Sequence, residues 1–149
     1  MKRWFLVIVV ALTGCRTHTL ADGTYSFTAG EVVRDDCGLQ QHPELFTTGV
    51  LHTTGNLVRL DYALFDLRLT GNYLASEEVM AIEGLATNER LGVNGNDCLL
   101  TQFAARLDAT AVDPMNLTGS WAFELKSDTP ACVCKLWVKT AAVMTQAAP

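Results

Sequence analysis

Apolar and polar residues alternate along most of the chain after Asp22. A period of two places the apolar side chains on one face of a β-strand. No stretch keeps the spacing of an amphipathic helix over three turns. The alternation predicts eight strands, at 24–33, 47–54, 57–63, 65–73, 78–87, 98–111, 117–126 and 132–143.

Residues that favour turns separate most of these predicted strands. Thr54-Gly55-Asn56 is typical of a tight hairpin, and Asn94-Gly95-Asn96-Asp97 is typical of a turn. The boundary at Leu64–Phe65 has neither glycine nor proline. The segments on either side of it could instead form one long, bulged strand, which would leave seven strands.

Eight successive strands with short turns predict an all-β fold, a single antiparallel up-and-down barrel, because closure removes the exposed sheet edges. A two-sheet β-sandwich is the alternative. The length of 149 residues fits one domain. We expect the barrel domain over residues 23–144, followed by a disordered tail at 145–149.

The first fifteen residues have a different pattern. Lys2 and Arg3 precede the apolar stretch Trp4–Leu12, which is too short to cross a bilayer. The run Leu12-Thr13-Gly14-Cys15 resembles the lipobox of bacterial lipoproteins, in which the cysteine is acylated and the peptide bond before it is cut. The resemblance implies a signal peptide at 1–14, a lipidated Cys15 and a short polar tether at 15–22.

This resemblance also implies a location. The lipid on Cys15 would attach the protein to a membrane from outside the cytoplasm without any spanning segment. In a Gram-negative host, Arg16 in place of the aspartate that retains lipoproteins implies the outer membrane. The formal net charge of −5 argues against a nucleic-acid partner, because phosphate contacts need a basic surface.

Four further cysteines, Cys37, Cys98, Cys132 and Cys134, form an even set. In an oxidising compartment they predict two structural disulfides. The two last cysteines lie on one face of one strand and should not bond each other, so each is expected to bond Cys37 or Cys98. An eight-stranded barrel brings all four to one rim, whereas a seven-stranded one moves Cys37 to the opposite rim.

The triplet Gly23-Thr24-Tyr25 opens the first predicted strand, and the longest loop, from Gly30 to Phe46, follows it. This order resembles calycin barrels, the group of the lipocalins, although that family usually has tryptophan as the aromatic and adds a C-terminal helix. The resemblance implies a lipocalin-like topology. Two more Gly-x-aromatic triplets begin at Gly71 and Gly119, but their surroundings share almost no residues, so we interpret the regular spacing as coincidence.

Two adjacent carboxylates and an imidazole in this loop are the main candidates for chemistry. Asp35, Asp36, His42 and Glu44 could bind a divalent cation or serve a hydrolase, and a solvated acidic loop is the alternative. The sequence lacks the Gly-x-Ser-x-Gly, His-Glu-x-x-His, Walker and dinucleotide-binding motifs. We therefore expect no cofactor and no catalytic site.

Together these features predict a non-catalytic, lipid-anchored lipoprotein of the cell envelope that binds a small apolar ligand or a protein partner. The alternative is a hydrolase or metal-dependent enzyme that uses residues 35–44. An eight-stranded barrel holds either side chains or one small ligand. Large inward residues such as Phe103, Trp121 and Leu136 could fill it, which would leave the rim and the outer surface for binding. Trp121 and Trp137 are candidates for the core or for ligand stacking.

Overall fold

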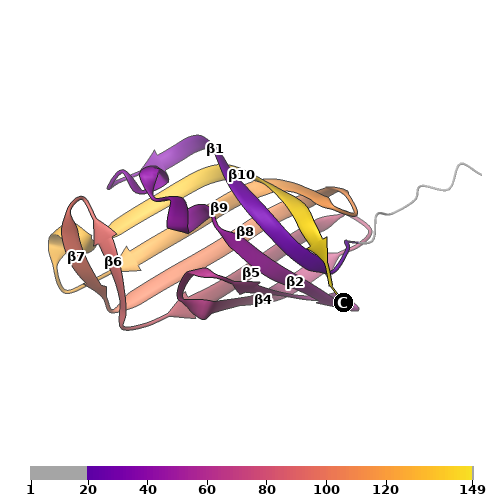
Figure 1. Cartoon of the computed structure of the whole chain (residues 1–149), viewed down its shortest axis with the longest axis horizontal. Helices are drawn as coiled ribbons and strands as arrows, with labels where there is room; N and C mark the ends of the chain where they lie inside the picture. Colours follow the sequence, from indigo (N-terminus) through magenta and orange to yellow (C-terminus); the bar gives the residue numbers. More distant parts are fainter. Residues whose placement is uncertain (1–19, 149) are drawn as a thin grey trace, which may run out of the picture.

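A computed structural model describes residues 20–148. Eight of its strands form a closed antiparallel barrel in the order β1-β10-β9-β8-β5-β4-β3-β2, and β6 and β7 pair with each other (Figure 1). The predicted all-β, eight-stranded up-and-down barrel is therefore confirmed. The strands are β1 (Gly23–Asp35), β2 (Thr48–Thr54), β3 (Leu57–Tyr62), β4 (Leu67–Leu74), β5 (Val79–Ala86), β6 (Glu89–Val93), β7 (Asn96–Leu100), β8 (Gln102–Asp113), β9 (Asn116–Lys126) and β10 (Cys134–Ala147).

The chain does turn at the Leu64–Phe65 boundary, so β3 and β4 are separate strands. A short 3₁₀ segment, η3 (Leu64–Asp66), joins them, and Phe65 and Asp66 adopt positive φ angles of 58° and 46°. This backbone is unusual for residues other than glycine. The ring of Phe65 packs edge-on against Phe103 with a centroid distance of 5.1 Å, which anchors the turn against the core.

The predicted strand at 98–111 is wrong at its start. Asn94 and Gly95 have φ angles of 50° and 77° and form the two-residue turn of the β6–β7 hairpin, because this hairpin geometry requires positive φ at both positions. The inward residues Leu91, Val93 and Leu100 are buried and join the core cluster. The alternation of buried and exposed residues thus continues through the β6–β7 hairpin, whose strands pair with each other and not with the barrel. The barrel strand β8 begins only at Gln102.

Both ends of the described chain belong to the barrel. β10 runs to Ala147, where it pairs with Gly23, so the expected disordered tail is wrong over residues 145–147. Leu20 is buried, and the backbone N–H of Ala21 donates to the carbonyl of Pro114, so residues 20–22 are not a free tether. The predicted signal peptide, Cys15 and the rest of the tether lie outside the described residues.

The two ends of the barrel differ (Figure 1). The turn end holds the β2–β3, β4–β5 and β8–β9 turns, at residues 54–57, 74–79 and 113–116, together with Leu20 and Ala148. The disulfide end holds the β6–β7 hairpin and the short 3₁₀ segments η1 (Leu39–Gln41), η2 (Pro43–Phe46) and η4 (Pro130–Cys132). The chain before Leu20 therefore enters the barrel at the turn end, and the disulfide end lies on the opposite side.

The three Gly-x-aromatic triplets share one local geometry. At each glycine, a Cβ would overlap a carbonyl oxygen of a neighbouring strand, and the aromatic side chain two residues later is buried. A glycine of this kind permits a close approach and a tight bend in a barrel strand. The triplets thus have a common steric role, which does not depend on their spacing. The glycines with their aromatic residues are Gly23 with Tyr25, Gly71 with Tyr73 and Gly119 with Trp121.

Candidate functional site

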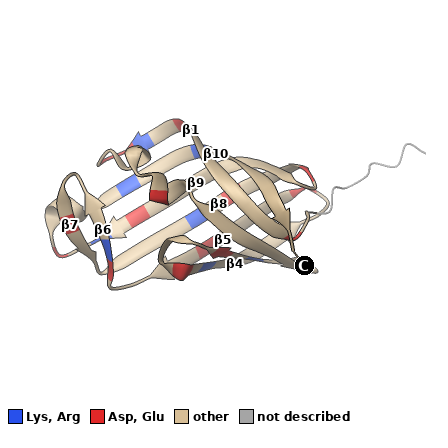
Figure 2. Cartoon of the chain, viewed as in Figure 1, with Lys and Arg blue, Asp and Glu red and all other residues tan. Residues whose placement is uncertain are grey.

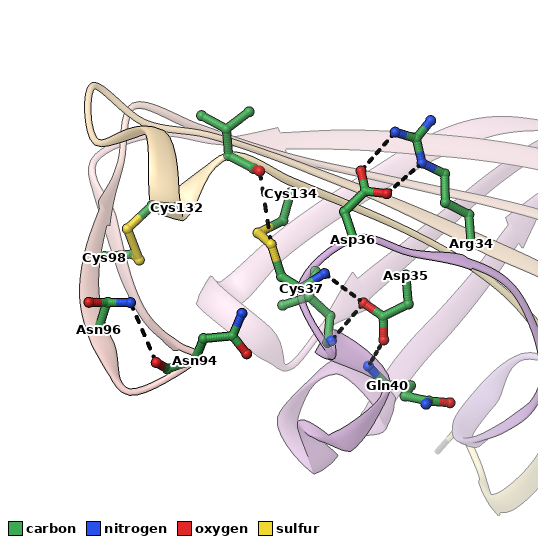
Figure 3. The surroundings of a disulfide bond; sticks show 12 residues. Arg34, Asp35, Asp36, Cys37, Gln40, Asn94, Asn96, Cys98, Cys132 and Cys134 are labelled. Carbon is green, nitrogen blue, oxygen red and sulfur yellow. Dashed lines mark hydrogen bonds and ion pairs between the residues drawn. A yellow bond between two sulfur atoms is a disulfide. The ribbon is translucent and has the colours of Figure 1, made fainter.

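Two disulfides close the disulfide end of the barrel (Figure 3). Cys37 bonds Cys134, which ties the loop after β1 to the start of β10. Cys98 bonds Cys132, which ties the β6–β7 hairpin to η4. As predicted, the two last cysteines do not bond each other and all four lie at one end. The loop after β1, the β6–β7 hairpin and η4 are therefore covalently held at this end.

Asp35 and Asp36 have separate structural partners. The carboxylate of Asp35 accepts hydrogen bonds from the backbone N–H groups of Cys37, Leu39 and Gln40, at 3.2, 2.8 and 3.0 Å (Figure 3). It thereby stabilises the turn that leads into η1. Asp36 forms a two-point ion pair with Arg34 at 2.9 and 2.7 Å, and this hydrogen bonding lowers the pKa of Asp36.

His42 and Glu44 form a third, separate pair in this loop. His42 Nδ1 lies 3.0 Å from Glu44 Oε1. Burial alone would raise the pKa of Glu44, but its own backbone N–H and His42 outweigh that effect and lower it. Among residues 20–148 no three His, Cys, Asp or Glu side chains are grouped so that they could hold a metal ion. The four predicted site residues therefore do not converge on one point.

The interior of the barrel is filled by aromatic side chains. Trp121 stacks on Phe123 at a centroid distance of 5.1 Å and lies 5.2 Å from both Phe27 and Tyr62. Phe103 continues this column toward the disulfide end, 5.7 Å from Phe123. All five are buried, as is Leu136. The large inward residues predicted to fill the barrel do so, and Trp121 is a core residue.

A groove of about 740 Å³ lies instead on the outer surface. Its floor is low because Ala104 on β8 and Ala122 on β9 present small side chains outward. Trp137 on β10, 47% exposed, and Leu85 on β5, 56% exposed, are the large apolar side chains beside this floor. The other lining residues are Arg34, Thr70, Glu83, Gly84, Ala105, Arg106, Phe123, Glu124, Lys135 and Leu136.

The register of the strands creates this groove. A single row of directly paired positions crosses five strands in the order Arg34, Trp137, Ala122, Arg106 and Glu83. The sequence alone does not reveal the groove, because the residues that line it come from strands far apart in the chain. Of the five residues in this row, only Trp137 is a candidate from the sequence, and the structure places it on the outer face.

The lining of the groove includes residues of both charge signs, Arg34, Arg106 and Lys135 together with Glu83 and Glu124. Figure 2 shows basic and acidic positions interspersed along these strands. Arg106 makes a two-point ion pair with Asp108 at 2.7 and 2.8 Å, which raises the pKa of Arg106. Lys135 Nζ lies 3.3 Å from Glu124 Oε1. Exposed pairs of this kind contribute little to stability. They can therefore exchange partners with a docking molecule at small cost to the fold.

The chain matches no protein-family model, no curated protein and no solved structure. None of the helices between residues 20 and 148 is long and apolar enough to cross a bilayer. The fold and the site by themselves define a class: a small, disulfide-bonded, eight-stranded β-barrel with a filled interior and an outer groove.

Proposed function

We propose that this chain is a non-catalytic, lipid-anchored protein of the cell envelope that docks a protein partner in its outer groove. The observation that carries the proposal is the filled barrel, whose aromatic column occupies the space that a small apolar ligand would need. Binding then falls to the outer surface, where the groove offers a hollow of about 740 Å³.

The composition of the groove suits a protein partner. Exposed tryptophan and arginine side chains are the types that contribute most binding energy in protein interfaces. Trp137 and Arg106 stand on either side of Ala122 in the same row, so a partner side chain could enter between them. Mixed charges around an apolar floor match the polar rim and apolar centre of such interfaces.

The proposed location has two supports. Two disulfides suit an oxidising compartment outside the cytoplasm. The lipobox-like run gives Cys15 a separate role as the acylated residue, and Arg16 after it favours the outer membrane in a Gram-negative host. The lipid on Cys15 would supply the membrane attachment.

Site-specific crosslinking in the cells that make the protein tests the docking surface. A photo-crosslinking amino acid in place of Trp137 should give one discrete adduct with a protein. The same amino acid in place of Leu99, which is 49% exposed on β7 at the disulfide end and outside the groove, should not. Equal adduct patterns at the two positions, or none at Trp137, would overturn the proposal, as would stoichiometric co-purification of an apolar ligand in native mass spectrometry.

A second variant shows whether the adduct depends on the groove itself. Ala122→Arg places a long side chain on the groove floor and should remove the adduct formed at Trp137. Leu99→Arg, at an exposed position outside the groove, is the matched control and should leave the adduct unchanged. Urea unfolding of both variants should remain within about 0.5 kcal/mol of the parent protein, because both are surface substitutions.

A further inference from the structure

The turn end of the barrel carries a continuous set of exposed apolar side chains next to its turns. Their exposed fractions range from 46% for Leu74 to 63% for Leu57. Leu57 follows the β2–β3 turn, Leu74 precedes the β4–β5 turn, and Val112 and Met115 flank the β8–β9 turn. Val143 completes this apolar rim, because it pairs with Asn116, the first residue of β9.

Backbone hydrogen bonds between neighbouring turns and strands hold the apolar rim together. The N–H of Tyr73 donates to the carbonyl of Asn56 at 2.8 Å, which brings Leu57 and Leu74 close. The N–H of Ala111 donates to Glu78 at 2.7 Å, and the N–H of Met144 donates to Met115 at 2.8 Å. These hydrogen bonds join neighbouring turns and strands, so the five exposed apolar residues gather at one end of the barrel.

The charge at the turn end is also distinctive. The segments that build it, residues 20–24, 53–58, 72–80, 109–119 and 141–148, contain no lysine, arginine or histidine. Two of their four carboxylates are held within the fold: Asp22 accepts hydrogen bonds from Thr53, and Asp113 accepts them from Met115 and Asn116. The other exposed large apolar residues, Val33, Leu85, Leu99, Val133 and Trp137, lie toward the disulfide end. Basic and acidic positions are interspersed along the strands there (Figure 2).

The length of chain before the barrel relates this end to Cys15. Leu20 is fixed at the turn end, because Ala21 bonds the carbonyl of Pro114 in the β8–β9 turn. Only five residue steps separate Cys15 from Leu20. Even fully extended, they span at most about 18 Å. A lipid on Cys15 would therefore keep the turn end next to the membrane surface.

We propose that the apolar rim, formed by Leu57, Leu74, Val112, Met115 and Val143, rests in the lipid surface to which Cys15 is attached. This inference rests on the lipid anchor of the proposed function. It orients the barrel with its turn end on the membrane and its disulfide end away from it, so the outer groove beside Trp137 stays accessible. The contact suits zwitterionic lipid, since the turn-end segments of the described chain have no cation to attract an anionic surface and carry Glu77 and Glu78 in the β4–β5 turn.

Quenching by brominated lipid tests this orientation. The full chain is processed in a lipoprotein-producing bacterium, and the mature protein is reconstituted in phosphatidylcholine vesicles with brominated acyl chains. In a Trp137→Phe background, the buried Trp121 remains and its fluorescence, measured in that parent, is subtracted as the baseline, so that Leu74→Trp reports on the rim. Leu99→Trp on β7 is the matched control, because Leu99 is 49% exposed, close to the 46% of Leu74, but lies at the disulfide end. Val112→Trp is a second rim position, in case Leu74→Trp does not fold.

We expect the fluorescence of the rim tryptophan to fall about twofold while that of Leu99→Trp stays unchanged, because an indole at the interface lies near the acyl chains. Equal quenching at both ends, no quenching at either rim position, or a requirement for anionic lipid would overturn the proposal. Mass spectrometry of the same samples reads the lipid on Cys15. If the lipid is absent, both proposals fail, whereas a lipidated protein without rim quenching overturns the orientation alone.

Discussion

Single hydroxyl groups connect separate parts of this molecule. The Tyr25 hydroxyl lies between the chain entry and the β8–β9 turn, 2.8 Å from the carbonyl of Ala21 and 3.2 Å from that of Pro114. Burial raises the pKa of Tyr25 to about 12, and the nearby carboxylates of Asp22 and Asp113 add to this shift. The proton on this hydroxyl therefore has a structural role, because the ionised ring could not donate to either carbonyl.

The raised pKa of Tyr25 predicts a loss of stability at alkaline pH. The folded-state pKa is about 12 and the ordinary value is 10.0, so the unfolded chain releases the proton first as the pH rises. The contribution of Tyr25 to the free energy of unfolding should therefore be fully present below pH 10 and should be lost between pH 10 and 12. Tyr25→Phe should lose on the order of 1 kcal/mol at pH 8, from its lost hydrogen bonds.

Urea unfolding at a series of pH values measures both effects. Across the alkaline range, Tyr25→Phe should show a shallower decline than the parent protein. Some decline should remain, because burial also raises the pKa of Tyr62, whose hydroxyl donates to the carbonyl of Leu45 at 2.5 Å. Parallel curves for the parent protein and Tyr25→Phe would show that Tyr25 does not contribute to the alkaline loss.

At the scale of elements, the strands bend where glycine lets a neighbour approach. Gly119 on β9 faces inward two residues before Trp121, and a Cβ there would overlap the carbonyl oxygen of Asp108 and atoms of Ala109 on β8. The backbone of a neighbouring strand cannot move aside as a flexible side chain can. The curvature of β9, and with it the position of Trp121 in the aromatic column, therefore depends on this glycine.

Gly119→Ala should destabilise the barrel by about 1–3 kcal/mol, because the added methyl group overpacks the contact between β8 and β9. Gly92→Ala on β6 is the matched control: nothing lies within 4 Å of a Cβ at that position. It should be neutral or slightly stabilising, since alanine restricts the unfolded chain more than glycine does. Midpoints of urea unfolding compare the two, and equal losses would contradict the steric explanation.

At the scale of the whole molecule, the two disulfides constrain unequal lengths of chain. Cys37–Cys134 links positions 97 residues apart. It joins the C-terminal end of β1 to the N-terminal end of β10, and the pairing of these two strands closes the barrel. Cys98–Cys132 spans 34 residues and holds the β6–β7 hairpin to η4. The longer loop loses more conformational entropy when it is closed in the unfolded chain.

Removing Cys37–Cys134 should therefore cost more than removing Cys98–Cys132. Each paired substitution, Cys37→Ala with Cys134→Ala or Cys98→Ala with Cys132→Ala, should destabilise by about 2–5 kcal/mol, with the first larger by roughly 1 kcal/mol. Thermal and urea unfolding of the two double variants measure this difference. A larger loss for the hairpin disulfide would mean that native packing at the disulfide end outweighs the entropy of the unfolded chain.

Local patterns explain how much could be predicted from the sequence. The alternation of apolar and polar residues depends only on the backbone geometry of a strand, so it located most of the barrel strands. Because successive strands run up and down the barrel, the strand count also predicted that all four cysteines lie at one end. The same pattern missed the β6–β7 hairpin, because Leu91 and Val93 on β6 and Leu100 on β7 have the same spacing whether these strands pair with each other or with the barrel. The turn at Leu64–Phe65 was predicted with a bulged strand as the alternative, because it has no glycine or proline and is anchored instead by a contact of Phe65 with Phe103.

The candidate site also combines features that the sequence predicts with features that only the folded chain shows. The sequence identified Asp35 and Asp36 as candidate ligands by residue type, but only the folded loop shows that backbone N–H groups and Arg34 engage them. The groove beside Trp137 exists only once β1, β10, β9, β8 and β5 are in register. By itself the sequence determined the all-β barrel and the partners open to each cysteine. The tertiary structure alone decided the filled interior, the groove and the apolar rim, because each combines side chains from strands that only long-range pairing brings together.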